Sequence, residues 1–238
     1  MVDIMRLLHK ISLVAATLLV SLLGFGQGPA AAAQANPLSA LTFAAVEQNS
    51  GPQLADAATG PRREDGDMVM GAANAPVTVI EYASMTCPHC ARFHTETLPK
   101  LKSAYIDAGV VKYVFRDFPL DRLALSAAMI AQCAGPDRYF NFIDVFFRQQ
   151  ASWAKGNEQE AMAALRRLAR LGGMSDAQID SCLANKQVQD SILATSVAGQ
   201  NQFQVRSTPT LIINGERHAG ALSFEELDKI IKPLAGKS

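Results

Sequence analysis

Residues 77–90 read Val-Thr-Val-Ile-Glu-Tyr-Ala-Ser-Met-Thr-Cys-Pro-His-Cys, and the rest of the chain is organised around them. Residues 77–82 are almost all β-branched or aromatic, which predicts a strand. The sequence from Ala91 onward predicts a helix, so the two cysteines lie in the first turn of a helix that follows a strand. A C-x-x-C in that setting is typical of a redox-active dithiol rather than of a metal site.

The two thiols are expected to have different roles because they lie at different depths in the helix. A thiolate at a helix N-terminus is stabilised by unpaired backbone N–H groups and by the positive end of the helix dipole, which lowers its pKa. We therefore predict that Cys87 is the exposed nucleophile and that Cys90, one turn further in, is the shielded resolving thiol.

Pro88 and His89 separate the two cysteines and are predicted to belong to the catalytic site. His89 is expected to favour the Cys87 thiolate, either by donating from its ring or as a nearby cation. A stabilised reduced form makes the corresponding disulfide a stronger oxidant, so His89 indicates an oxidising protein. The alternative is that His89 is a solvent-exposed loop residue without a role.

Glu81 precedes Cys87 by six residues and interrupts the apolar run of the first strand. Near-continuous hydrophobicity predicts a central strand covered on both faces, which would bury this carboxylate behind the cysteines. We predict that Glu81 moves a proton to or from Cys90. The alternatives are an exposed glutamate at an edge, or one paired with Lys112. His94 is expected at the surface of the helix.

The N-terminus has the pattern of an export signal. Arg6 and Lys10 precede an apolar run at 11–25, and small residues follow it. This pattern predicts a cleaved signal peptide at 1–35 and a periplasmic protein. An uncleaved anchor is the alternative, but the run is shorter than the roughly 18 to 20 residues that span a bilayer. The formal net charge is zero and no basic stripe is visible, so nucleic acid is not an expected partner.

Beyond the signal, the order of expected elements defines the fold. Residues 36–66 lack periodicity and are predicted to be a flexible segment. The expected strands are a short edge strand within 68–73, then 77–82, 110–115, 210–213 and 216–219. The expected helices are 91–108, kinked at Pro99, then 123–134, 137–150, 158–171, 175–184, 186–202 and 223–234. A helix joins the first two long strands, so they are expected to be parallel. The order predicts an α/β thioredoxin fold with an inserted all-helical subdomain: first half 67–120, insertion 121–204, second half 205–238.

Two further features bear on the site. Thr208-Pro209 enters the strand at 210–213, where a proline cannot donate to the ladder; we predict that these two residues bind substrate. Cys133 and Cys182 lie 49 positions apart near helix ends; bridged, they would tie the insertion together, and the alternative is a second redox pair. They form no second C-x-x-C, so no metal site is predicted.

Residues 81–90, the helical insertion, and Ser207 to Thr210 with Asn214-Gly215 resemble the bacterial DsbA family of thiol:disulfide oxidoreductases, especially its alphaproteobacterial branch. The resemblance covers about 67–234. It implies that Cys87 attacks, that Cys90 resolves, that Glu81 is a buried acid and that Thr208-Pro209 is a cis-proline loop. It also implies a monomer without a cofactor, whose partners are unfolded Cys-containing exported proteins and a membrane reoxidant similar to DsbB.

Thr208 departs from the pattern of the enterobacterial oxidase, which has valine before the proline, and matches the isomerases DsbC and DsbG. A disulfide isomerase or reductase is therefore the alternative function. Those isomerases carry an N-terminal dimerisation domain, and 36–66 is too short and irregular for one. A third hypothesis is a periplasmic protein that binds metal through its dithiol without turnover.

Overall fold

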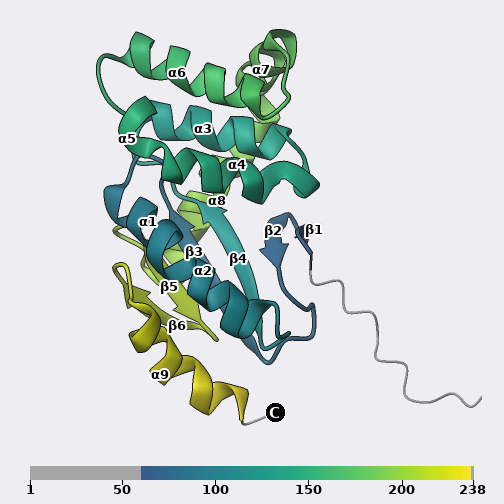
Figure 1. Cartoon of the computed structure of the whole chain (residues 1–238), viewed down its shortest axis with the longest axis vertical. Coiled ribbons are helices and arrows are strands. Elements are labelled where there is room, and N and C mark those ends of the chain that lie inside the picture. Colours follow the sequence, from purple (N-terminus) through teal and green to yellow (C-terminus); the bar gives the residue numbers. More distant parts are fainter. Residues whose placement is uncertain (1–59, 237–238) are drawn as a thin grey trace, which may run out of the picture. The chain divides into compact units, whose positions relative to one another are not determined.

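The computed structural model describes residues 60–236. The predicted signal peptide at 1–35 and most of the segment at 36–66 lie outside this range, so both remain predictions. Among the described residues, no helix is both long and apolar enough to cross a membrane. The predicted α/β architecture with a helical insertion is confirmed (Figure 1).

A six-stranded mixed sheet forms the centre of the fold. In spatial order the strands are β1 (Arg62–Glu64), β2 (Asp67–Met70), β4 (Val111–Asp117), β3 (Val77–Ala83), β5 (Thr210–Ile213) and β6 (Glu216–Ala219). β3 and β4 are parallel, as predicted, and Glu81 pairs in register with Phe115. β5 pairs with β3 in the antiparallel direction, which brings the Thr208-Pro209 segment to the end of β3 that leads into the cysteines.

The segment after the C-x-x-C is a helix of mixed type rather than one kinked α-helix. It consists of α1 (Pro88–Arg92), a π-helical turn (Phe93–Thr97), α2 (Leu98–Leu101) and a second π-helical turn (Lys102–Ile106). Pro99 lies in the first turn of α2, where a missing N–H is tolerated. The wider π-helical turns shift the side chains away from the 3.6-residue period. His94 lies in the first of these turns.

The inserted helices follow the predicted pattern closely. They are α3 (Arg122–Cys133), α4 (Pro136–Arg148), α5 (Gln150–Trp153), α6 (Glu158–Leu171), α7 (Asp176–Leu183) and α8 (Lys186–Phe203); α9 (Phe224–Ala235) ends the fold. Asn157, Ser175 and Ser223 begin α6, α7 and α9 with reciprocal capping boxes. Helix α5 was not predicted, because the preceding helix was expected to continue through Gln150.

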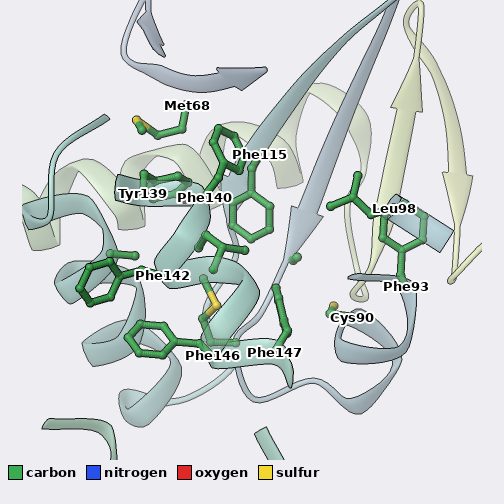
Figure 2. Close-up of a cluster of buried hydrophobic side chains, with 14 of the residues drawn as sticks. Met68, Cys90, Phe93, Leu98, Phe115, Tyr139, Phe140, Phe142, Phe146 and Phe147 are labelled. Carbon is green, nitrogen blue, oxygen red and sulfur yellow. The ribbon is translucent and has the colours of Figure 1, made fainter. Parts of the chain in front are cut away.

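One apolar core joins the insertion to the sheet. Phe142, Phe146 and Phe147 of α4 are buried in the same cluster as Phe115 of β4 and Cys90 of α1 (Figure 2). Burying a side chain of this size stabilises the fold by roughly 1.5–3 kcal/mol. The insertion therefore contributes to the apolar core that surrounds Cys90.

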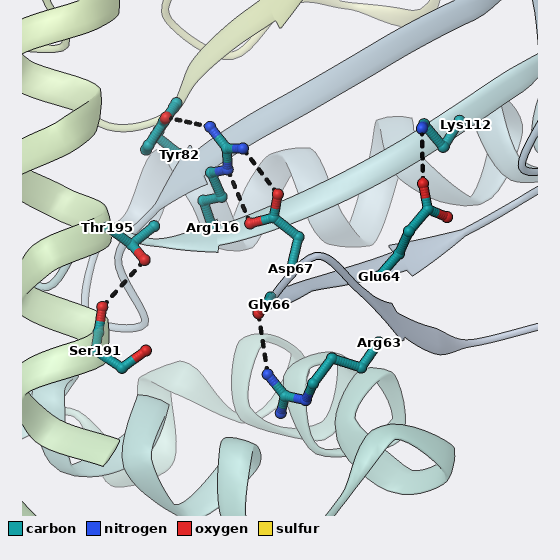
Figure 3. A network of polar contacts seen from close by, with 9 residues as sticks. All are labelled: Arg63, Glu64, Gly66, Asp67, Tyr82, Lys112, Arg116, Ser191 and Thr195. Carbon is teal, nitrogen blue, oxygen red and sulfur yellow. Dashed lines mark hydrogen bonds and ion pairs between the residues drawn. The ribbon is translucent and has the colours of Figure 1, made fainter. Parts of the chain in front are cut away.

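The predicted flexible segment is wrong at its C-terminal end, where β1 pairs with β2. β1 reads Arg-Arg-Glu and has no apolar alternation, so its sequence gave no strand signal. An ion pair and a hydrogen bond hold it instead: Lys112 contacts Glu64 at 2.9 Å, and Arg63 donates to the side-chain oxygen of Gln132 at 2.8 Å. Figure 3 shows Lys112 with Glu64, which excludes the alternative pairing of Lys112 with Glu81.

Candidate active site

The loop before α1 places Cys87 at the N-terminus of the helix. The Cys87 N–H donates to the Ser84 carbonyl at 3.0 Å, and the Cys87 carbonyl accepts from the Ala91 N–H at 3.1 Å. Pro88 occupies the first helical turn, where its fixed φ fits and no N–H is needed. The predicted strand–loop–helix setting of the two cysteines is present.

Both cysteines are free thiols, and both are more buried than the sequence analysis expected. Cys90 is fully buried, in agreement with a shielded thiol, and Cys87 exposes only 6% of its surface. The prediction of an exposed nucleophile is therefore wrong in degree. The cause is tertiary: the Cys87 Sγ donates a hydrogen bond to the carbonyl of Thr208 at 3.2 Å, across the cis Thr208–Pro209 peptide.

The surroundings of Cys87 favour its thiolate. A hydrogen bond from the Cys90 thiol lowers the pKa of Cys87 to about 5. The nearby Thr208 hydroxyl, which has no hydrogen-bond partner among the described residues, and the backbone N–H groups of Cys90 and His89 act in the same direction. Partial burial opposes these effects without outweighing them. The pKa of Cys87 therefore lies below that of an ordinary thiol, which favours its thiolate over the protonated form that donates to the Thr208 carbonyl.

Cys90 has the opposite character. Burial raises the pKa of Cys90 far above its ordinary value, and the hydrogen bond to Cys87 and the negative charge of Glu81 raise it further. Two thiols only three positions apart are thus separated into a thiolate and a protonated thiol. A pair of thiols with such different acidities can divide attack and resolution between them.

The contribution of His89 in the structure comes through its backbone. Its N–H stabilises the Cys87 thiolate, whereas its exposed ring lies 3.3 Å from the Arg92 guanidinium through Nδ1. Among the described residues, no hydrogen bond joins the His89 ring to Cys87, so the predicted action of the ring stays a prediction.

Glu81 is fully buried on β3, as expected of a central strand. Its Oε2 accepts a hydrogen bond from the Tyr113 hydroxyl and lies 2.9 Å from Nε2 of His94. Its Oε1 is buried without a hydrogen-bond partner among residues 60–236. One carboxyl oxygen of Glu81 therefore has two polar partners, and the other has none among the described residues.

His94 corrects a prediction, because it is buried rather than at the helix surface. It lies in the π-helical turn and stacks on Phe147, with the ring centroids 4.2 Å apart. Sequence reasoning also missed Tyr113 as a partner of Glu81. A signal existed for Tyr113: Val79 pairs with it in the parallel ladder, and Glu81 lies on the same face two residues on.

Cys133 and Cys182 form a disulfide that joins the last residue of α3 to α7, with a Cα–Cα distance of 6.1 Å. It lies within the helical insertion and in a small cluster with Met129 and Ile192. No cluster of three or more potential metal ligands occurs in the described part of the chain.

Comparison of the sequence with known protein families agrees with the fold and the cysteine site described above. The sequence profile of the family described as thioredoxin matches residues 63–233, which is most of the chain. The chain therefore belongs to the thioredoxin family.

Individual relatives show which group within the thioredoxin family this chain resembles. The crystal structure of alpha-DsbA1 from Wolbachia pipientis matches with a TM-score of 0.68 and 32% identity, over 73% of this chain and 93% of that chain. Disulfide bond formation protein D of Bacillus subtilis is 28% identical over 79% of this chain and 86% of that protein. A Rickettsia felis protein, provisionally named a protein-disulfide oxidoreductase, is 31% identical over 71% of this chain. The chain spans 60% of the length of that relative. Within the thioredoxin family, this chain is a DsbA-type protein.

Proposed function

We propose that this protein is a thiol:disulfide oxidoreductase that introduces disulfide bonds into exported proteins through Cys87 and Cys90. The observation that carries the proposal is the opposite perturbation of the two thiols: the pKa of Cys87 is lowered to about 5 and that of Cys90 is raised. A stabilised thiolate in the reduced form makes the disulfide form a stronger oxidant.

In the first step a substrate thiolate attacks the Cys87 sulfur of the Cys87–Cys90 disulfide. A mixed disulfide forms between substrate and Cys87, and Cys90 leaves as a thiolate that takes up a proton. In the second step another substrate thiolate attacks the substrate sulfur of the mixed disulfide. Cys87 leaves as a thiolate, which at its low pKa needs no proton. The substrate loses two electrons and the protein gains them.

Glu81 is proposed to serve the proton uptake by Cys90. Its negative charge acts directly on the pKa of Cys90, and its second oxygen has no other hydrogen-bond partner in the described part of the chain. The carboxyl group would supply the proton when Cys90 leaves and accept it when Cys90 attacks during reoxidation. Tyr113 and His94 would hold the carboxylate in place.

Thr208 and Pro209 are proposed to bind the substrate chain beside Cys87. The Thr208 carbonyl already accepts the Cys87 thiol at 3.2 Å, so a substrate strand laid along this loop would bring its cysteine to Cys87. Recognition through backbone groups fits unfolded Cys-containing proteins of many sequences. We propose a periplasmic location, a monomer, and reoxidation by a membrane protein similar to DsbB.

The test is oxidation of a reduced, unfolded model protein by the oxidised enzyme, with Cys87→Ser as the inactive control. Stoichiometric transfer of one disulfide per enzyme, followed by turnover when an oxidant is added, is the expected result. Failure of the oxidised enzyme to oxidise the substrate would exclude the proposal. Metal analysis of the reduced protein separates this function from dithiol metal binding.

A second candidate is a disulfide isomerase. Thr208 before the proline favours it, and so does a structure titled protein-disulfide isomerase from Novosphingobium aromaticivorans, with a TM-score of 0.62 and 27% identity. Reactivation of scrambled ribonuclease, together with a mass measurement in solution, distinguishes the two. A monomer that oxidises reduced ribonuclease but does not unscramble it supports the oxidase.

A further inference from the structure

The short helix α5 brings one side chain of the insertion to the backbone of the active-site loop. Gln150, the first residue of α5, is more than nine-tenths buried. Its Nε2 donates to the Met85 carbonyl at 2.8 Å and to the Cys87 carbonyl at 3.0 Å. One amide group thus uses both of its N–H donors on the loop that carries the nucleophile.

The Cys87 carbonyl is the acceptor through which Gln150 would act on the thiolate. The same oxygen accepts the first hydrogen bond of α1, from the Ala91 N–H. The Cys87 carbonyl belongs to the same helical turn as the N–H groups of His89 and Cys90, and both N–H groups lower the pKa of the Cys87 thiol. The amide of Gln150 also places positive hydrogens at a carbonyl close to the developing negative charge.

The short helix α5, which carries Gln150, is anchored to α4. Trp153 is fully buried and donates from Nε1 to the Phe146 carbonyl at 2.7 Å. The Trp153 ring also packs on the Phe146 ring, with the centroids 5.9 Å apart. Gln150 therefore reaches the active-site loop from a helix that is fixed to the insertion.

We propose that Gln150 is a positioning residue for thiol:disulfide exchange, which sets the thiolate character of Cys87 through the Met85 and Cys87 carbonyls. The inference rests on the proposed function and adds to it. It makes the helical insertion part of the redox chemistry, through a residue that no C-x-x-C pattern would reveal.

The test compares Gln150→Met, which keeps the shape and removes both N–H donors, with Gln149→Met at the exposed neighbouring position. We expect the acid dissociation constant of the Cys87 thiol to fall about tenfold in Gln150→Met. The pKa of Cys87 then rises by about one unit, and the Cys87–Cys90 couple becomes about 30 mV more reducing. Gln149→Met should leave both quantities at the wild-type value. A lower melting temperature of Gln150→Met with unchanged pKa and potential would reduce Gln150 to a structural role and overturn the proposal.

A measurement on the wild-type protein covers the case in which Gln150→Met does not fold. The side-chain amide NMR signal of Gln150 should shift during a pH titration of the reduced protein, with the Cys87 midpoint near pH 5. The shift should be absent in Cys87→Ser. A signal that does not move through the Cys87 transition overturns the proposal. If wild-type Cys87 itself titrates as an ordinary thiol, the proposed function fails instead, so the two failures are distinguishable.

Discussion

At the scale of single residues, the chemistry depends on where each thiol finds its hydrogen bonds. Cys87 is surrounded by donors, whereas Cys90 lies in the apolar core with the Glu81 carboxylate nearby. The same functional group therefore has two different acidities within one helical turn. Thr208 and Glu81 are two of the residues that keep the acidities of Cys87 and Cys90 apart.

Replacing Thr208 by valine removes its hydroxyl and keeps its shape. Because the Thr208 side chain favours the Cys87 thiolate, the pKa of Cys87 should rise by about one unit, the size expected of one hydrogen bond. Alkylation rates measured against pH will report the shift. Thr210→Val, at a buried position in the adjacent strand, is the control. An unchanged alkylation profile in Thr208→Val would contradict the assigned role of the hydroxyl.

Glu81→Gln should impair proton transfer at Cys90 without changing substrate binding. Without the carboxylate, the step in which Cys90 attacks or leaves should slow by roughly a hundredfold, the lower range of general acid–base catalysis. Rapid-mixing measurement of mixed-disulfide formation with a substrate that has a single thiol, the step in which Cys90 leaves, gives this rate. Lys112→Met, which removes the ion pair between β4 and Glu64 of β1, should have the wild-type rate. Equal rates in Glu81→Gln and wild type would remove Glu81 from the catalytic group.

At the scale of elements, local pattern predicted most of the fold and only part of the site. The strand at 77–82, the hairpin at Asn214-Gly215 and the capped helices have strong local signals, and each is present. His94 was misplaced because a π-helical turn breaks the helical period, and this turn has no sequence signature. Gln150 was missed because its role depends on where α5 packs against a loop more than sixty residues earlier. Tertiary contacts of this kind are invisible to periodicity.

The Cys133–Cys182 disulfide should stabilise the insertion without tuning the active site. Replacing both cysteines by serine should lower the free energy of unfolding by roughly 4 kcal/mol in the chain-entropy model. Urea unfolding of the variant and wild type, each with its active-site cysteines reduced, measures this loss. The reduction potential of Cys87–Cys90 should stay the same. A changed potential would favour the alternative of a regulatory redox pair.

At the scale of the whole molecule, Asp117 links the sheet to the insertion. Its Oδ2 accepts from Gln132 of α3 and from Tyr139 of α4, both at 3.0 Å, and burial raises its pKa to about 6. Its second oxygen, Oδ1, is buried without a partner among the described residues. Because Asp117 connects β4 to α3 and α4, the free energy of unfolding should depend on whether its carboxyl group is protonated.

The sign of that dependence follows from the native pKa, which lies above the unfolded value of 3.8. The native state binds more protons between these values, so the free energy of unfolding should fall as the pH rises from about 4 to 6, by up to about 3 kcal/mol. Asp117→Asn should lack this decrease. Urea unfolding at several pH values tests it, and parallel curves for the two proteins would contradict the assignment.

The central claim is that this chain stabilises its reduced form through the Cys87 thiolate and is therefore an oxidant. The most direct measurement is the equilibrium of the purified protein with glutathione at pH 7, which gives the reduction potential of Cys87–Cys90. We predict a potential well above the approximately −270 mV of thioredoxin, which falls towards that value in Gln150→Met and Thr208→Val. A potential as reducing as that of thioredoxin, with an ordinary thiol pKa for Cys87, would contradict the account.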